Sequence, residues 1–162
     1  MTDETAAGNG QAQNNAPNAP IQVLAQYVKD LSFENPNAPQ SLLPGQPQPQ
    51  VSVNVDTQAR PLNQEAGLYE CLLTLRAEAK AEEQTVFLVE VTYGGVFAIQ
   101  GVAPEHHRPL MLIEAPRLLF PFARAVVAEC TRDGGYPPLM VNPIDFAELF
   151  RQQLGAQQTA NA

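Results

Sequence analysis

The side chains in this sequence that are able to carry chemistry are few and scattered. The only histidines, His106 and His107, are neighbours whose side chains should diverge, and no cysteine lies nearby to complete a metal site. The two cysteines, Cys71 and Cys130, lie far apart in apolar sequence, without a histidine or a basic cluster to lower their pKa. We therefore expect no metal site and no nucleophile, and we interpret both cysteines as buried free thiols.

The remaining motifs do not predict an enzyme or a cofactor either. Gly94-Gly95 and Gly134-Gly135 lack the flanking pattern of a phosphate-binding loop. Glu82-Glu83 is a pair of carboxylates, but adjacent acids in a turn are usually solvated charges. We expect a protein that works through binding surfaces.

Charge and hydropathy limit the partners. The net charge of −8 argues against nucleic acid, because phosphate binding requires a basic surface. Residues 21–105 hold ten acids and four bases, so the acidity of this half is available to a basic partner. No apolar run approaches a membrane span, and the polar start lacks the pattern of a signal peptide, so we expect a cytoplasmic protein that does not insert into membranes.

Period-two alternation predicts four strands in the first part of the chain, at 21–34, 51–56, 68–79 and 86–93. We expect the fourth to end at Gly94-Gly95, with more extended chain after it. A crossover rich in proline separates the first two strands. Residues 1–20 are polar and predict a disordered tail, and residues 155–162 predict a flexible C-terminal tail.

The alternation also predicts what each face of the sheet carries. In the first strand, apolar side chains fall on one side and are interrupted by Lys29; they are Ile21, Val23, Ala25, Tyr27, Leu31 and Phe33. If each strand turns its more apolar side inward, Asp30, Glu34, Leu88 and Glu90 share the other, exposed face. This pattern predicts an acidic face that contains one apolar residue.

Helical spacing begins after Pro104. Apolar residues recur at Leu118, Leu119, Phe122, Val126, Val127 and Cys130, and the helix should stop at Gly134-Gly135. A last helix is predicted from Asp145 to Leu154, with Asp145 and Glu148 at capping-box spacing. The fold class is therefore α+β, with an antiparallel sheet packed on one face by two helices.

Three segments of the chain resemble the SecB family of protein-export chaperones. They are YVKDLSFENPNAP (27–39), TVFLVEVTYGGVFAIQG (85–101) and APRLLFPFARAVVAECTRDGGYPPLMVNPIDFAELF (115–150), and the likeness covers 21–154 as one chaperone domain. The resemblance implies Greek-key connections in the sheet and a homotetramer built as a dimer of dimers. It also implies a protein without metal or other cofactor that binds unfolded precursor proteins and delivers them to the translocation ATPase SecA.

The resemblance implies a role for three sets of residues. SecA is expected to contact Asp30, Glu34, Leu88 and Glu90, the four residues that alternation places on one face. Precursor contacts are expected at Val51, Val53, Val55, Phe97, Tyr136, Leu139, Phe146 and Phe150. The subunit interface is expected at Leu119, Phe122, Val126 and Cys130.

Two other interpretations stay open. Within the family, the chain is alternatively a specialised chaperone of a toxin–antitoxin system, although the intact acidic face argues against this. From another class, it is a non-chaperone oligomeric adaptor whose apolar stripes serve assembly alone.

Overall fold

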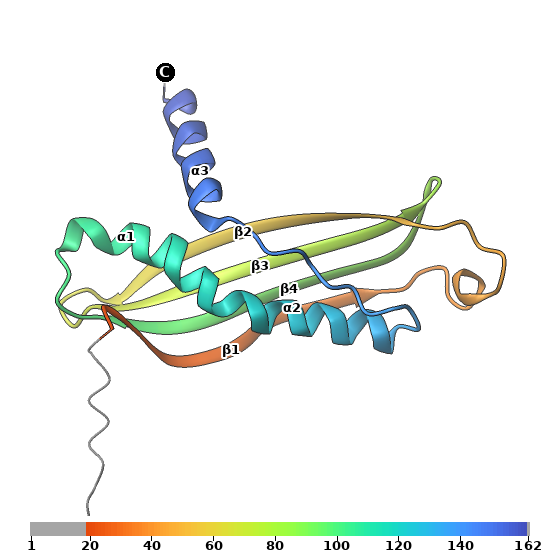
Figure 1. Cartoon of the computed structure of the whole chain (residues 1–162), viewed down its shortest axis with the longest axis horizontal. Coiled ribbons are helices and arrows are strands. Elements are labelled where there is room, and N and C mark those ends of the chain that lie inside the picture. Colours follow the sequence, from red (N-terminus) through yellow and green to blue (C-terminus); the bar gives the residue numbers. More distant parts are fainter. Residues whose placement is uncertain (1–18, 162) are drawn as a thin grey trace, which may run out of the picture.

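A single antiparallel sheet forms the framework of the chain in a computed structural model that describes residues 19–161 (Figure 1). Its strands are β1 (Ile21–Glu34), β2 (Gln50–Asn63), β3 (Leu68–Ala81) and β4 (Gln84–Ile99). The spatial order is β1-β4-β3-β2. Hairpins join β2 to β3 and β3 to β4, while the crossover carries the chain from one sheet edge to the other. This is a Greek key, as the family resemblance implied.

Two strands extend further than predicted. β2 continues past Asp56 to Asn63 and pairs with β3 along this whole length, with Pro61 opposite Tyr69 and, after a register shift, Asn63 opposite Leu68. β2 lies at the sheet edge, where a proline is tolerated, so Pro61 does not end it. β4 also runs straight through Gly94-Gly95 to Ile99 instead of ending there.

The two sides of the sheet differ sharply. One side carries the odd-numbered residues of β3, of which Cys71, Leu73 and Leu75 are fully buried. We call it the helix-facing side, because Leu119 of a helix lies against Gly95 of β4 there. The other side, called the open face below, is covered by no helix of the described residues (Figure 1).

A bent helical run crosses the helix-facing side. It consists of η2 (Pro104–His106), α1 (His107–Pro109), the π-helical turn η3 (Leu110–Glu114) and α2 (Ala115–Asp133). Pro121 lies inside α2, where it lacks an N–H for the helical hydrogen bond. As predicted, α2 ends at the double glycine: the Gly134 N–H donates to the Cys130 carbonyl at 2.9 Å, and Gly135 has a φ of +97°.

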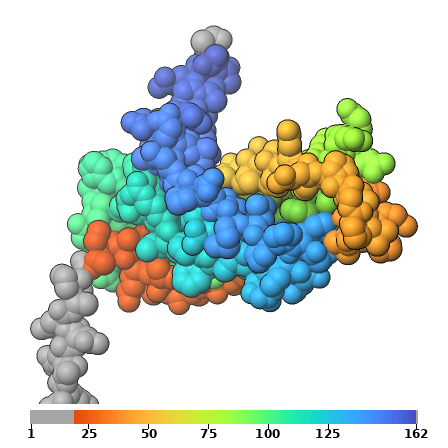
Figure 2. Space-filling view, turned by 45° about the vertical axis from the view of Figure 1, so that its right-hand side comes forward, coloured from red at the N-terminus to blue at the C-terminus, as the bar shows by residue number. Residues whose placement is uncertain are grey.

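Helix α3 (Phe146–Ala160) begins at the buried Phe146 and projects from the rest of the molecule toward its C-terminal end (Figures 1 and 2). The carboxylate of Asp145 accepts a hydrogen bond from the Glu148 N–H at 3.0 Å, so Asp145 caps the helix at the predicted start. The predicted end at Leu154 is wrong. Gly155 does not stop the helix, and residues up to Ala160 are helical, although they were predicted to be a flexible tail.

The predicted N-terminal tail falls almost wholly on residues 1–18, which lie outside the described residues. Within 19–161, no helix is both long and apolar enough to cross a membrane.

Candidate functional site

Acidic side chains gather on the open face at the end where β1 finishes. In the register of β1 with β4, Glu34 lies opposite Leu88, and Ser32 lies opposite Glu90; Asp30 follows on the same side of β1. Asp30 and Glu34 are exposed, while Leu88 and Glu90 are partly exposed. The fold thus brings together the four residues that alternation predicted, and we call Asp30, Glu34, Leu88 and Glu90 the acidic patch.

Two β-bulges in β1 decide which of its side chains join this face. The pairing with β4 skips Leu24 and Lys29, and each bulge shifts the alternation by one residue. Ala25 and Tyr27 therefore lie on the open face, and the prediction that they point inward is wrong. The second bulge is what places both Tyr27 and Asp30 on the same face.

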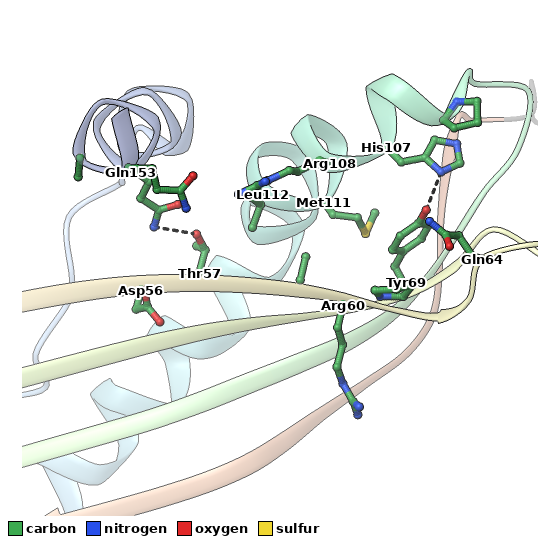
Figure 3. Close-up of a pocket in the computed structure, with 15 residues that line it drawn as sticks. Asp56, Thr57, Arg60, Gln64, Tyr69, His107, Arg108, Met111, Leu112 and Gln153 are labelled. Carbon is green, nitrogen blue, oxygen red and sulfur yellow. Dashed lines mark hydrogen bonds between the residues drawn. The ribbon is translucent and has the colours of Figure 1, made fainter. Parts of the chain in front are cut away.

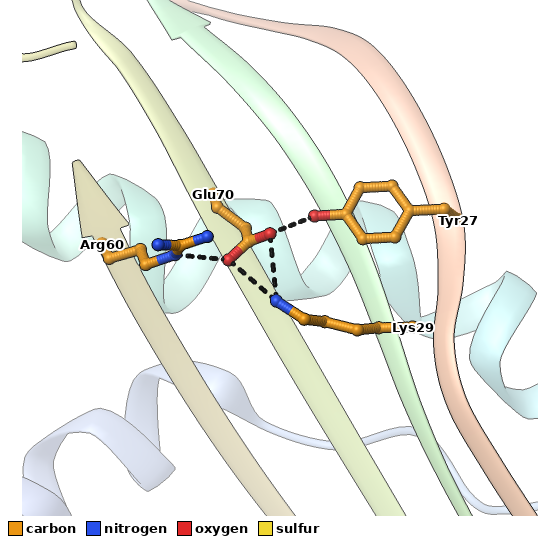
Figure 4. Close-up of polar contacts among 4 residues, drawn as sticks. All are labelled: Tyr27, Lys29, Arg60 and Glu70. Carbon is orange, nitrogen blue, oxygen red and sulfur yellow. Dashed lines mark hydrogen bonds and ion pairs between the residues drawn. The ribbon is translucent and has the colours of Figure 1, made fainter. Parts of the chain in front are cut away.

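A buried carboxylate ties three strands together further along the open face (Figure 4). Glu70 of β3 accepts hydrogen bonds from the Tyr27 hydroxyl at 2.5 Å and from Arg60 Nε at 2.6 Å. Lys29 Nζ lies 3.4 Å from both carboxylate oxygens. The Tyr27 ring crosses β4 over Gly94, where a Cβ atom would overlap the ring. Glycine at this position therefore makes the Tyr27–Glu70 contact possible.

This cluster keeps Glu70 ionised. The hydrogen bonds from Arg60 and Tyr27 lower the pKa of Glu70 to about 2, and burial together with the bond to Glu70 raises the pKa of Tyr27 to about 12. With Arg60 and Lys29 beside it, the negative charge of Glu70 is offset and does not enlarge the acidic patch.

An apolar strip lies on the opposite side of the sheet, along β2. Val51 and Val53 are 42% and 38% exposed, and Val55 is half-buried against the core. Because β2 is an edge strand, its outer backbone groups are also available. Among the described residues, no backbone group outside the sheet pairs with it.

Beyond these valines, β2 borders a cavity of about 640 Å³ that also lies against the helical run and α3 (Figure 3). Met111 contributes apolar surface to the wall of the cavity, and hydrogen-bonded side chains contribute polar surface. The hydroxyl of Tyr69 lies 2.8 Å from Nδ1 of His107, and the Gln153 amide donates to the Thr57 hydroxyl at 3.5 Å. The second ring nitrogen of His107 is 2.9 Å from the Val102 carbonyl, so both of its nitrogens are occupied.

The crossover after β1 is fastened to the loop that follows α2. The Tyr136 hydroxyl donates to Asn35 Oδ1 at 2.6 Å and lies 2.7 Å from the Ser41 hydroxyl. Its ring packs on Phe87 with centroids 5.1 Å apart. Leu42 and Leu43 of this crossover are exposed, so the segment adds apolar surface near Tyr136.

Helix α2 carries two adjacent apolar stripes that face different surroundings. The inner stripe, Leu119, Ala123 and Val127, is fully buried against the sheet. The outer stripe comprises Leu118, Phe122, Val126 and Cys130, at a spacing of four residues. Phe122 is 49% exposed and stacks on Tyr93 with centroids 6.2 Å apart. Val28 and Leu31 of edge strand β1 are exposed on the same side of the sheet, so this apolar surface has no cover among residues 19–161.

Comparison with known proteins identifies the group to which this architecture belongs. Residues 12–157 match the model of the family described as preprotein translocase subunit SecB. The protein-export protein SecB of Rhodospirillum centenum is 54% identical over 158 residues, which cover 95% of this chain and 93% of that protein. The SecB of Maricaulis maris is 49% identical over 161 residues, covering 99% and 91%.

The chain belongs to the SecB family. The expectation drawn from the three sequence segments is confirmed. The fold agrees as well, since a SecB-like chaperone of Mycobacterium tuberculosis, solved in complex with a ChAD peptide from an antitoxin, superposes with a TM-score of 0.65. The sequence identity is 14%, and the superposition covers 77% of this chain and 91% of the other chain.

Three residues predicted to lie on binding surfaces of this SecB chain are core residues instead. Phe97 and Phe146, predicted to contact precursor, are buried at 0% and 1% exposure. Leu119, predicted at the subunit interface, is buried at 0% and packs over Gly95. Sequence periodicity marks apolar positions on an element but does not tell which of two neighbouring stripes meets the sheet.

The other predicted residues keep some exposure. Tyr136, Leu139 and Phe150 are half-buried, as are Val126 and Cys130 of the outer stripe. These side chains are therefore accessible to a partner, and their roles in precursor contact and in assembly stay predictions.

Two charged residues beside the acidic patch, Arg76 and Glu78, were not among the predicted site residues. Arg76 lies opposite Glu90 and Glu78 lies opposite Leu88 in the pairing of β3 with β4. The Arg76 guanidinium is 3.7 Å from the Glu90 carboxylate. Both are even-numbered residues of β3 and so lie on the side away from the buried Leu75. The missing signal was the register, which cannot be read from one strand alone.

The thiols of this chain are poorly suited to nucleophilic chemistry. Burial raises the pKa of Cys71 to about 12 and also raises that of Cys130. Between residues 19 and 161, no three metal-ligating side chains come together.

Proposed function

We propose that this SecB chain is a protein-export chaperone of the cytoplasm that binds unfolded precursors, keeps them competent for translocation and passes them to SecA. The observation that carries the proposal is the match to SecB proteins at about half identity over nearly the whole chain. The separation of apolar and acidic surfaces on opposite sides of one sheet supports it. An adaptor would need the apolar surface for assembly alone.

Precursor binding is proposed along the helix-facing side, from Val51, Val53 and Val55 on β2 to Tyr136, Leu139 and Phe150. An unfolded chain offers aliphatic and aromatic side chains, and burying them against such a strip stabilises the complex by about 25 cal/mol per Å² of apolar area. The open edge of β2 can add backbone hydrogen bonds to an extended segment. Contacts of this kind favour broad recognition without a fixed sequence.

SecA docking is proposed on the acidic patch. A basic element of the partner would face the carboxylates of Asp30, Glu34 and Glu90, with Leu88 as an apolar contact among them. Such charge complementarity mainly increases the rate of association and is weakened by salt.

Assembly into a homotetramer, a dimer of dimers, is proposed through the apolar surface shared by α2 and β1. The outer stripe with Phe122, Val126 and Cys130 would be sealed against a second subunit. Pairing of β1 edges between protomers would satisfy backbone groups of β1 that have no partner in the described part of the chain.

Light scattering of the purified chain with a denatured precursor, held unfolded, tests the proposal. We expect a species of four chains that forms a soluble complex with the precursor and loses the precursor to added SecA. An oligomer that ignores the precursor would identify an adaptor. A species that binds the precursor but does not respond to SecA would favour a specialised chaperone of the toxin–antitoxin kind.

A further inference from the structure

Arg76 places a positive charge at the border of the acidic patch, next to Glu90. In the three-strand register, Arg76 of β3 lies beside Glu90 of β4, which lies beside Ser32 of β1. The next row of the open face contains Glu78, Leu88 and Glu34. The guanidinium therefore lies beside Glu90, one of the carboxylates that are proposed to receive a basic partner.

The contact between Arg76 and Glu90 is loose. Nη1 and Oε2 are 3.7 Å apart, which is longer than a hydrogen bond. The two side chains are 44% and 38% exposed, and ion pairs with this exposure contribute little to folding. A competing cation can therefore separate them. Lys80, 3.8 Å from Glu78, forms a similar loose pair at the edge of the same surface.

These observations contrast with the Glu70 cluster on the same face. There the carboxylate is nearly inaccessible and held by three donors, so a partner cannot reach it. Glu90 keeps one loose neighbour and an exposed carboxylate. The ion pairs of Glu70 therefore stabilise the sheet, whereas a ligand cation can replace Arg76 next to Glu90.

We propose that Arg76 limits the affinity of the acidic patch: it is a neighbouring cation that a basic partner must displace from Glu90. The proposal rests on the proposed docking of SecA to this patch. Removing the charge of Arg76 should free Glu90 and remove a repulsion from the incoming basic group.

Binding of purified SecA to the assembled chain, measured by titration calorimetry over a series of salt concentrations, tests this. For Arg76→Gln we expect about two- to fivefold tighter binding at low salt and a steeper loss of affinity as salt is added. Arg76→Lys keeps the charge and should bind like the wild type. Arg151→Gln changes the net charge equally but lies on α3, away from the patch, and is 68% exposed, so it should also bind like the wild type.

Glu90→Lys serves as the separate test of the docking face itself, and we expect it to lose most of its SecA affinity. If Glu90→Lys weakens binding but Arg76→Gln does not tighten it, the inference about Arg76 is wrong and the docking face stands. Equal tightening by Arg76→Gln and Arg151→Gln would show an effect of net charge and would also overturn it. If neither Arg76→Gln nor Glu90→Lys changes the affinity, the docking face is wrong and the inference falls with it.

Discussion

Glu70 shows how a single carboxylate contributes to the stability of an uncovered sheet face. Its hydrogen bonds to Arg60 and Tyr27 join β2, β3 and β1, and its pKa is lowered to about 2. A carboxylate with a lowered pKa contributes its full stability above its ordinary pKa of 4.5, and that contribution is lost as the pH falls toward about 2. Glu70 therefore stabilises the fold throughout the neutral range.

Replacing Glu70 by Gln should lower the free energy of unfolding by on the order of 1 kcal/mol at neutral pH, because three donors lose a charged acceptor. Urea denaturation of both proteins at a series of pH values checks this. The difference between wild type and Glu70→Gln should shrink below the ordinary pKa of the carboxyl. A difference that does not vary with pH would contradict the assignment of the charge to this cluster.

Asp30 is the residue of the acidic patch whose proposed contact with SecA is tested most directly. Asp30→Lys should weaken SecA binding about tenfold at low salt and less at high salt, while precursor holding stays unchanged. Glu65→Lys is a matched control, since Glu65 is also an exposed carboxylate residue but lies in the β2–β3 hairpin at the other end of the sheet. A parallel loss of precursor holding in Asp30→Lys would show that the two surfaces are not separate.

At the scale of elements, strand β1 shows how far alternation reaches. Its bounds, Ile21–Glu34, agree with the prediction, and Leu31 and Phe33 face the helices as expected. Ala25 and Tyr27 face the other side, because the bulge at Leu24 shifts the alternation by one residue until the bulge at Lys29 shifts it back. Both bulges are defined only by the pairing with β4. The interruption by Lys29 was visible in the sequence, but its consequence requires knowledge of the neighbouring strand.

Helix α2 makes a prediction that separates folding from assembly. Leu119→Ala should cost about 2–5 kcal/mol of stability, because it opens a cavity in the core. Phe122→Ala, three positions along, should change the stability of the subunit little but reduce the fraction of tetramer. Thermal unfolding and light scattering measure the two effects. A Phe122→Ala protein that remains fully tetrameric at low concentration would remove this stripe from the interface.

At the scale of the whole molecule, the sheet has the apolar strip of β2 on its helix-facing side and the acidic patch on its open face. Val51→Ser with Val53→Ser should weaken precursor binding about tenfold, because two exposed valines lose apolar contact area. Ser52→Ala with Asn54→Ala, on the open face of the same strand, is the control and should leave binding unchanged. Fluorescence titration with a labelled unfolded precursor is the measurement, and equal affinities for both double variants would exclude the valine strip as a binding site.

The sequence predicted the α+β class, the order of the elements and the composition of the acidic patch, since these follow from local periodicity and charge. It did not separate core from surface among Phe97, Phe146 and Leu119, since that depends on how the helical run lies on the sheet. It also missed Arg76, whose relation to Glu90 exists only in the paired strands. The features that could not be predicted depend on tertiary structure: the strand register, the β-bulges and which of two adjacent stripes of α2 packs on the sheet.

The bare open face has a consequence for the order of events in export. A single layer of strands lies between the valine strip and the acidic patch, so occupancy of one side does not sterically block the other. On the proposed assignments, precursor and SecA can be held at once in a ternary complex. On these assignments SecA can bind before the precursor dissociates. Transfer of the precursor to SecA then requires no free, aggregation-prone precursor in solution.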